Sequence, residues 1–220
     1  LLRKGRCFLQ EPALQAIQLV KFELPRTQGA SFQGHLLLTH TDLVIGADGW
    51  CAAARRVDSP NRDARPDDAP VSLIVLHSIS LPPGDFGGPW IEHLFTNRLD
   101  PSAHPYFVDI SALRVSSHFV VRRDGGLLQF VSTLERAWHA GVSSWQGRSR
   151  CNDFSVGIEF EGCNVLPFEA AQYARACALI GALRQRHPIA DVVGHSDVAP
   201  GRKTDPGACF DWSAVGIPRP

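Results

Sequence analysis

The loop of residues 194–207, GHSDVAPGRKTDPG, brings a histidine, two aspartates and a lysine close together in the chain. Lys203 stands out because the chain has three lysines among its 22 basic residues, and the others are arginine. A lysine ammonium is a compact point charge, whereas an arginine guanidinium is a planar fork. We interpret Lys203 as a candidate for holding the negative oxygen of a tetrahedral intermediate, with a solvated loop lysine as the alternative.

Two apolar strand patterns end in a histidine. VSLIVLH ends at His77 and ADVVGH ends at His195, and Asp205 follows the second histidine in the same loop. Two imidazoles and one carboxylate match a zinc site that keeps its fourth position open for water, which is typical of catalytic rather than structural zinc. Such a site acidifies the water that it binds. The sequence therefore predicts one catalytic Zn²⁺ held by His77, His195 and Asp205.

Four other side chains compete for a place in this ligand set. His118 begins a strand pattern, and His139, in RAWHAG, could line the cleft. Asp197 is closer in sequence to His195 than Asp205 is, and Cys209 would be a soft ligand at plausible range. Spacing alone leaves these alternatives open.

Glu159 is the candidate general base. In FSVGIEFEG (154–162) the apolar residues alternate with Ser155, Gly157, Glu159 and Glu161. We expect Glu161 to face solvent, and we expect Gly157 to leave room for a ligand beside Glu159. A carboxylate beside an activated water can take its proton and pass it to the leaving amine. Glu159 and Lys203 are thus the predicted catalytic pair.

The elements that would position these residues alternate between strand and helix patterns. Strands are expected at 71–77, 154–162 and 190–195, and a hairpin is expected at 116–132 around Asp124-Gly125-Gly126. Helices are expected at 89–100 and at 168–188, the second stopped by Pro188. This order predicts an α/β fold with a central mixed β-sheet flanked by helices.

From about residue 44 to its end the chain resembles the bacterial AmpD family of N-acetylmuramoyl-L-alanine amidases, whose fold is shared with T7 lysozyme and peptidoglycan recognition proteins. The stretches that carry the resemblance are ISLPPGDFGGPWIEHLF, DPSAHPYF, LRVSSHFVVRRDG, RAWHAGVSSWQGRSRCNDFSVGIEFEG and GHSDVAPGRKTDPGACFDW. The resemblance implies the same zinc ligands and catalytic pair. It also implies a muropeptide substrate, 1,6-anhydro-N-acetylmuramoyl-peptide, cleaved between the lactyl group and L-alanine during cytoplasmic peptidoglycan recycling.

The resemblance further implies that Trp138, Arg114 and Arg150 line the substrate cleft. An arginine can bind a peptide carboxylate through two hydrogen bonds, and an indole can cover a sugar face. One departure follows His77, where this chain reads HSISLPPG and family members often read HNISLPPG. Ser78 keeps a hydrogen-bonding group without the reach of an amide, so we expect it to contact substrate differently.

Composition limits the partners and the compartment. The formal net charge is zero and no basic stripe is present, so we expect no nucleic-acid partner. No apolar run approaches the roughly 18 residues that span a bilayer, and no membrane contact is expected. The six cysteines have no paired spacing, which predicts free, mostly buried thiols in a reducing compartment. With no secretory pattern in residues 1–30, we expect a cytoplasmic protein.

We divide the chain into an N-terminal extension, residues 1–42, and an amidase domain, residues 43–220; the sequence does not predict an oligomeric state. Two alternatives remain within the fold: a muropeptide-binding module without turnover, and an envelope amidase acting on intact cell wall. A binding module tolerates loss of a ligand, whereas all five expected site residues are present here. A metal-free hydrolase is disfavoured because the chain has no G-x-S-x-G motif.

Overall fold

The computed structural model describes residues 43–66 and 69–218, so the predicted extension lies outside the described residues. A mixed sheet carries the fold, with strand order β1-β5-β4-β9-β3-β10. At its centre, β3 (Leu73–Ile79) and β9 (Ser155–Glu161) run parallel, and their register places His77 opposite Glu159. The predicted α/β class with a central mixed sheet is confirmed.

The remaining strands of this sheet are short. β4 (Phe119–Val121) and β5 (Leu127–Gln129) form the predicted antiparallel hairpin, while β1 (Arg55–Arg56) and β10 (Asp191–Gly194) are parallel edge strands. Two small antiparallel pairs lie outside it: β2 (Arg62–Ala64) with β6 (Glu135–Ala137), and β7 (Ser144–Trp145) with β8 (Arg148–Ser149).

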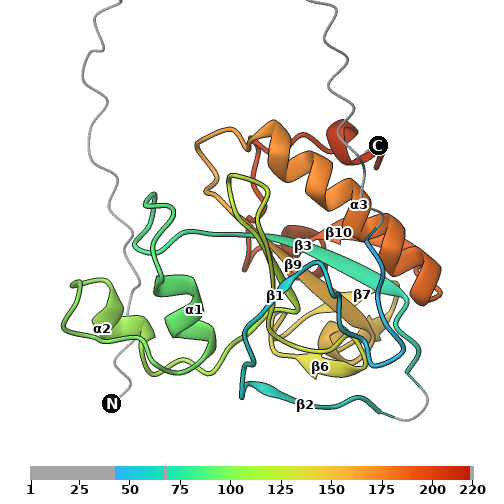
Figure 1. Ribbon diagram of the computed structural model, residues 1–220, viewed down its shortest axis with the longest axis horizontal. Coiled ribbons are helices and arrows are strands. Elements are labelled where there is room, and N and C mark those ends of the chain that lie inside the picture. Colours follow the sequence, from blue (N-terminus) through green and yellow to red (C-terminus); the bar gives the residue numbers. More distant parts are fainter. Residues whose placement is uncertain (1–42, 67–68, 219–220) are drawn as a thin grey trace, which may run out of the picture. The chain divides into compact units, whose positions relative to one another are not determined.

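Strand alternation separates an apolar face from a site face. Ile74 and Leu76 of β3 belong to the same core cluster as Leu179 and Leu183 of α3 (Ala170–Arg186), which lies along one side of the sheet (Figure 1). Successive side chains of a strand point to opposite faces. His77, one residue after Leu76, therefore points away from α3, and Glu159 faces the same way.

The shorter helices lie beyond the other side of the sheet. α1 (Trp90–Phe95) and α2 (Phe107–Ile110) contribute to a second core cluster with β4 and β5 (Figure 1). α1 is shorter than predicted because the chain turns at Asn97, whose φ is 59°. α4 (His195–Val198) follows β10 directly, and 3₁₀ turns cover Cys151–Asp153 and Ser213–Val215.

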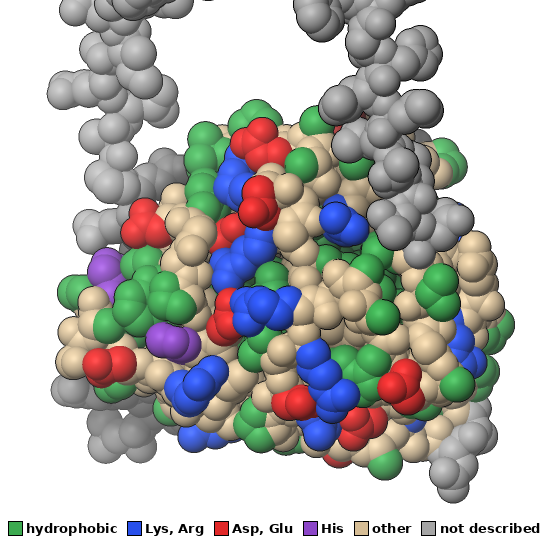
Figure 2. Space-filling view, viewed as in Figure 1, with side chains coloured by type: hydrophobic (Ala, Val, Ile, Leu, Met, Phe, Trp, Pro, Cys, Tyr) green, Lys and Arg blue, Asp and Glu red, His purple; other side chains and the backbone are tan. Residues whose placement is uncertain are grey.

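Glu161 is buried, so the prediction that it faces solvent was wrong. It is 2% exposed and accepts hydrogen bonds from Arg122 Nη1 and the Gly87 N–H, both at 2.7 Å. Arg122 also contacts Glu92, which pairs with Arg55, and Figure 2 shows cationic and acidic side chains side by side on this face. The Glu161 side chain, at the end of β9, therefore contacts a network of ion pairs and not solvent.

The five described cysteines are free, as predicted, but only Cys51 and Cys151 of these are buried; Cys7 lies outside the described residues. Cys163 and Cys209 are partly exposed and Cys177 is exposed, so the expectation that most are buried was wrong. Among the described residues, no helix combines the length and the apolar character that crossing a bilayer requires.

Candidate active site

The ends of two neighbouring strands and one loop bring together the three predicted metal ligands. His77 lies in β3, His195 begins α4 directly after β10, and Asp205 lies in the loop that follows. His77 Nδ1 is 2.9 Å from His195 Nδ1, and Asp205 Oδ2 is 3.2 Å and 3.0 Å from these two atoms. Three potential ligand atoms thus face one point.

This arrangement fits a tetrahedral zinc ion. Nitrogen and oxygen ligands lie about 2.0–2.2 Å from zinc, which separates neighbouring ligand atoms by roughly 3.3 Å. The three separations are close to that value, and the atoms are of the types that zinc prefers. Both imidazoles are buried, with His77 1% and His195 3% exposed, so a cation here would be held within the fold rather than on its surface.

The electrostatics of the cluster favour a bound cation. Burial lowers the pKa of His77 to about 4, against the opposing effect of Asp205, so its imidazole is neutral near pH 7. Burial would raise the pKa of Asp205, but the His195 and His77 imidazoles that contact its carboxylate hold that pKa well below its usual range. Neutral imidazole and ionised carboxylate are the forms that bind metal.

The alternative ligands are occupied elsewhere or lie outside the cluster. His118 Nδ1 accepts the Gly157 N–H at 3.0 Å, and Asp197 Oδ2 accepts the Gly194 N–H at 2.6 Å. Cys209 is not part of the cluster among the described residues. His139 contacts the far nitrogen of His77, Nε2, at 3.0 Å, and therefore lies behind a proposed ligand rather than within the cluster.

Glu159 faces the cluster from β9. Its Oε1 lies 4.0 Å from His77 Nδ1, and within the described residues its buried Oε2 has no hydrogen-bond partner. Burial raises the pKa of Glu159 well above its ordinary value; the negative charge of Asp205 adds to this, and Lys203 opposes it. An unpartnered buried carboxylate oxygen is costly unless something binds it, so Oε2 is placed for a water or substrate.

A cavity of about 620 Å³ opens over these groups. Its lining includes the three proposed ligands, Glu159 and Lys203, and also Trp138 and Ser78. Lys203 is on the exposed loop between α4 and Asp205, so its ammonium can approach a substrate from the open side. A second hollow of about 740 Å³ lies beside Glu161, but the guanidinium groups of Arg55 and Arg122 are already paired there with carboxylates.

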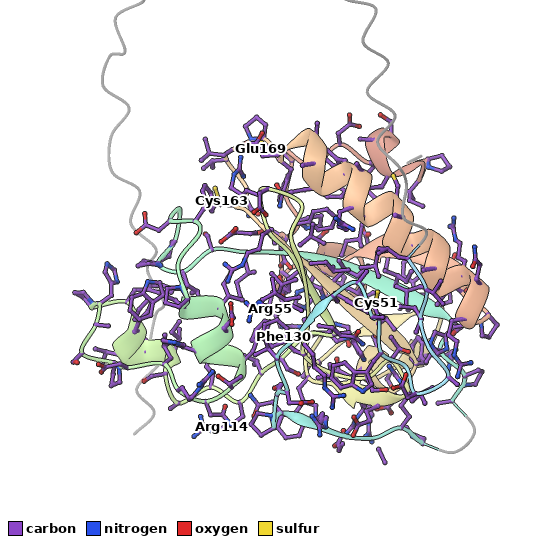
Figure 3. All side chains as sticks on the ribbon, viewed as in Figure 1. Cys51, Arg55, Arg114, Phe130, Cys163 and Glu169 are labelled. Atoms are coloured by element: carbon purple, nitrogen blue, oxygen red, sulfur yellow. The ribbon has the colours of Figure 1, made fainter. Side chains whose placement is uncertain are left out.

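Two of the four predicted substrate-binding residues line the cavity, and two do not. Arg114 donates to backbone carbonyls of its own loop, at Ala112 and Leu113, and lies at the periphery of the molecule (Figure 3). Arg150 is exposed and pairs with Asp153 at 3.2 Å. Neither arginine belongs to the cavity lining, so their roles stay predictions.

The space beside Gly157 is filled, so the prediction that it admits a ligand was wrong. A Cβ at this position would lie 2.6 Å from His139 Cγ and 2.7 Å from Ser117 Oγ. His139 lines the cavity, as the sequence analysis allowed, whereas Arg202 is a lining residue whose place the sequence did not reveal. Arg202 Nη2 donates to the carbonyls of Ala140 and Val142, and no motif or spacing in the sequence predicts these two hydrogen bonds.

The model of the N-acetylmuramoyl-L-alanine amidase family, Amidase_2, matches residues 67–208 and so includes the three proposed ligands, Glu159 and Lys203. The chain belongs to this family. It is an amidase. The relative 1,6-anhydro-N-acetylmuramyl-L-alanine amidase AmpD from Citrobacter freundii is 58% identical over 168 residues, covering 76% of this chain and 90% of the relative.

Two solved structures extend the comparison. The crystal structure of a selenomethionine AmpD derivative has a TM-score of 0.75 and 58% identity, covering 77% of this amidase and 96% of that chain. AmiD from Escherichia coli, solved with the substrate anhydro-N-acetylmuramic acid-L-Ala-D-γ-Glu-L-Lys, has a TM-score of 0.50 and 28% identity, covering 80% and 66%. The predicted family is confirmed.

Proposed function

We propose that this amidase hydrolyses the amide bond between the lactyl group of 1,6-anhydro-N-acetylmuramic acid and L-alanine in muropeptides, and that it requires zinc. The substrate is supported by the relatives, which are named as 1,6-anhydro-N-acetylmuramyl-L-alanine amidases, and by the anhydro-muramyl peptide bound to AmiD. One observation carries the chemistry: three ligand atoms within about 3 Å of one another at the wall of the cavity, beside an unpartnered carboxylate oxygen.

His77, His195 and Asp205 would hold the zinc ion. When bound, zinc polarises a carbonyl and lowers the pKa of a water to near neutrality. Glu159 Oε2 then takes the proton of the attacking water and later delivers it to the leaving L-alanine amine. Burial raises the pKa of Glu159 and so favours its protonated form, which suits delivery of the proton to the leaving amine.

Lys203 supplies positive charge on the open side of the cavity. During hydrolysis of an amide, negative charge builds on the former carbonyl oxygen, and a fixed cation nearby stabilises that charge more than it stabilises the neutral substrate. We assign this role to the Lys203 ammonium. Its position in the cavity lining and its electrostatic effect on both His77 and Glu159 support the assignment.

Trp138 and Ser78 contact substrate in this proposal. The Trp138 indole donates through Nε1 to Asp63 at 3.2 Å, which orients its ring at the cavity wall, where it can cover a sugar face. Ser78 follows His77 in β3 and offers its hydroxyl to the muramyl group. Arg114 and Arg150 would bind carboxylates of the peptide, and each must first leave its present partners.

We place this reaction in cytoplasmic peptidoglycan recycling, with the muropeptide as the partner. The free thiols among the described residues support this placement, since unpaired cysteines are typical of reducing compartments. The decisive experiment incubates purified protein with anhydro-muropeptide and with reduced muropeptide, and detects released peptide by mass spectrometry. We expect release from the anhydro form, loss of activity with EDTA and recovery on adding Zn²⁺. Full activity after thorough removal of metal would refute the zinc requirement.

A further inference from the structure

We infer that the dipeptide His139–Ala140 orients both imidazoles of the metal cluster, so that their Nδ1 atoms face Asp205 without protons. The inference rests on the proposed zinc site and concerns the residues behind it. Each ligating histidine has a second nitrogen, Nε2, that points away from the cluster. His77 Nε2 lies 3.0 Å from His139 Nδ1, and His195 Nε2 lies 3.3 Å from the Ala140 carbonyl.

The hydrogen bonds behind His77 form a chain that ends on the backbone. His139 Nε2 is 3.2 Å from Ser155 Oγ, and Ser155 Oγ donates to the Cys151 carbonyl at 2.6 Å. A carbonyl oxygen accepts and cannot donate. The single hydroxyl proton of Ser155 is therefore committed to Cys151, and Ser155 Oγ must accept from His139.

The direction of every earlier bond follows from this end point. His139 carries its proton on Nε2 because it donates to Ser155, so its Nδ1 is an acceptor. His77 must then donate from Nε2, which leaves its Nδ1 with a free lone pair toward His195 and Asp205. Reversing the chain would place a proton on His77 Nδ1 inside the cluster and would leave the Cys151 carbonyl without the Ser155 proton.

His195 is oriented by the next residue along the same segment. Its Nε2 faces the Ala140 carbonyl, which can only accept, so His195 too carries its proton on Nε2 and presents a bare Nδ1. The Ala140 carbonyl also accepts from Arg202 Nη2 at 2.7 Å, and Arg202 holds the Val142 carbonyl at 2.6 Å. The carbonyl is thereby anchored in the direction that His195 requires.

The backbone of the dipeptide is anchored from the opposite side. Asn152 Oδ1 accepts the N–H of His139 at 3.2 Å and the N–H of Ala140 at 2.8 Å. Gly157 leaves the space that the His139 ring occupies, because any side chain at this position would collide with that ring. A ligand's outer hydrogen-bond partner sets its tautomer and ring orientation, and losing such a partner typically weakens metal binding by about 10- to 100-fold.

The test compares His139→Leu with His139→Asn. The two new side chains have similar shapes, but asparagine keeps an acceptor oxygen near the position of Nδ1 and leucine has none. Zinc affinity is measured by competition with a chromophoric chelator, and the absorption spectrum of the Co²⁺-substituted protein reports ligand geometry. We expect His139→Leu to weaken Zn²⁺ binding by about 10- to 100-fold with an altered Co²⁺ spectrum, and His139→Asn to stay within about threefold of wild type.

Equal zinc affinity in wild type and both variants would overturn the inference, and so would equal losses in both variants, since the acceptor would then be irrelevant. If His139→Leu does not fold, Ser155→Ala decides the question: it removes the end of the chain without touching a ligand, and unchanged zinc affinity in it would also refute the inference. A wild-type protein that binds no zinc would instead refute the proposed function, so the two failures are distinguishable.

Discussion

Replacing Glu161 by glutamine tests whether the end of β9 is held by a buried charge. The carboxylate accepts from Arg122 Nη1 and the Gly87 N–H through Oε1, and from the Arg123 N–H at 3.3 Å through Oε2. Glutamine keeps one acceptor oxygen, but its amide NH₂ must face at least one of these donors. It also removes the negative charge beside Arg122, whose side chain is 14% exposed.

The expected loss follows from these contacts. A buried donor left without a partner costs about 1–3 kcal/mol, and removing one member of a buried ion pair costs about 3–5 kcal/mol. Arg122 still reaches Glu92 at 3.2 Å, so we expect the lower part of that range, about 3 kcal/mol. The assay is urea unfolding at neutral pH followed by tryptophan fluorescence.

Asp58→Asn is the matched control, because Asp58 pairs with Arg56 at 2.9 Å where both side chains are more than half exposed, at 52% and 54%. An exposed pair contributes about 0–1 kcal/mol, so this variant should unfold close to wild type. A loss below about 1 kcal/mol in Glu161→Gln, no larger than in the control, would refute the argument that the buried charge stabilises the end of β9.

Other predictions concern the packing of Gly157 against His139, the proposed catalytic pair and the buried His187. Gly157→Ala should destabilise the fold by about 1–3 kcal/mol through overpacking, and should therefore lower the melting temperature. Gly181→Ala in α3 is the control: an added Cβ there meets nothing within 4 Å, so this variant should melt no lower than wild type. Glu159→Gln and Lys203→Ala should both keep zinc, and Lys203→Ala should lower kcat by about 10²- to 10³-fold; wild-type turnover in either variant would move its assigned role elsewhere. Burial lowers the pKa of His187 from 6.5 to about 4, so the unfolded chain takes up this proton first, and stability is full above pH 6.5 and falls as the pH drops toward 4. His187→Gln, which can still reach Thr133, should flatten that part of the unfolding free energy against pH by up to about 3 kcal/mol, and an unchanged slope would contradict a neutral buried His187.

The sequence predicted the parts of the site that depend on strand ends. His77 and His195 each close an apolar run, and β3 and β10 are parallel neighbours, so their carboxyl ends meet at the same edge of the sheet. Local pattern was sufficient there because parallel register and strand length together place the side chains. Spacing alone did not separate Asp205 from Asp197 and Cys209, and the family resemblance favoured Asp205. The structure supplies the reason: its loop returns to α4, where the Asp205 carbonyl accepts the Ser196 N–H at 3.0 Å.

The sequence misled where a side chain's partner comes from a distant segment. Glu161 follows the alternation of β9. Alternation predicts the face of the sheet on which a side chain lies, but it does not predict which residues pack over that face. The cover here is Arg122, at the end of β4, and the Gly87 loop after β3. In the same way a glycine in a strand predicts a close approach, but it cannot say whether a substrate or, as at Gly157, an imidazole makes that approach.

The two faces of the central strands differ in what they pack against, and this difference explains how the proposed metal-binding residues can be brought together on one of them. On the α3 face, branched and aromatic side chains fill the space against a long helix. On the other face β9 offers Ser155 and Gly157, small residues that let the loop containing His139 approach the strand backbone closely. In a loop, unlike in a helix, a backbone carbonyl such as that of Ala140 is not taken by an intrahelical bond and can face the Nε2 of a proposed ligand, His195. The small residues of β9 and the loop containing His139 therefore act together to position His77 and His195. Enlarging the small residues or changing that loop should disturb these two imidazoles without disturbing the α3 core.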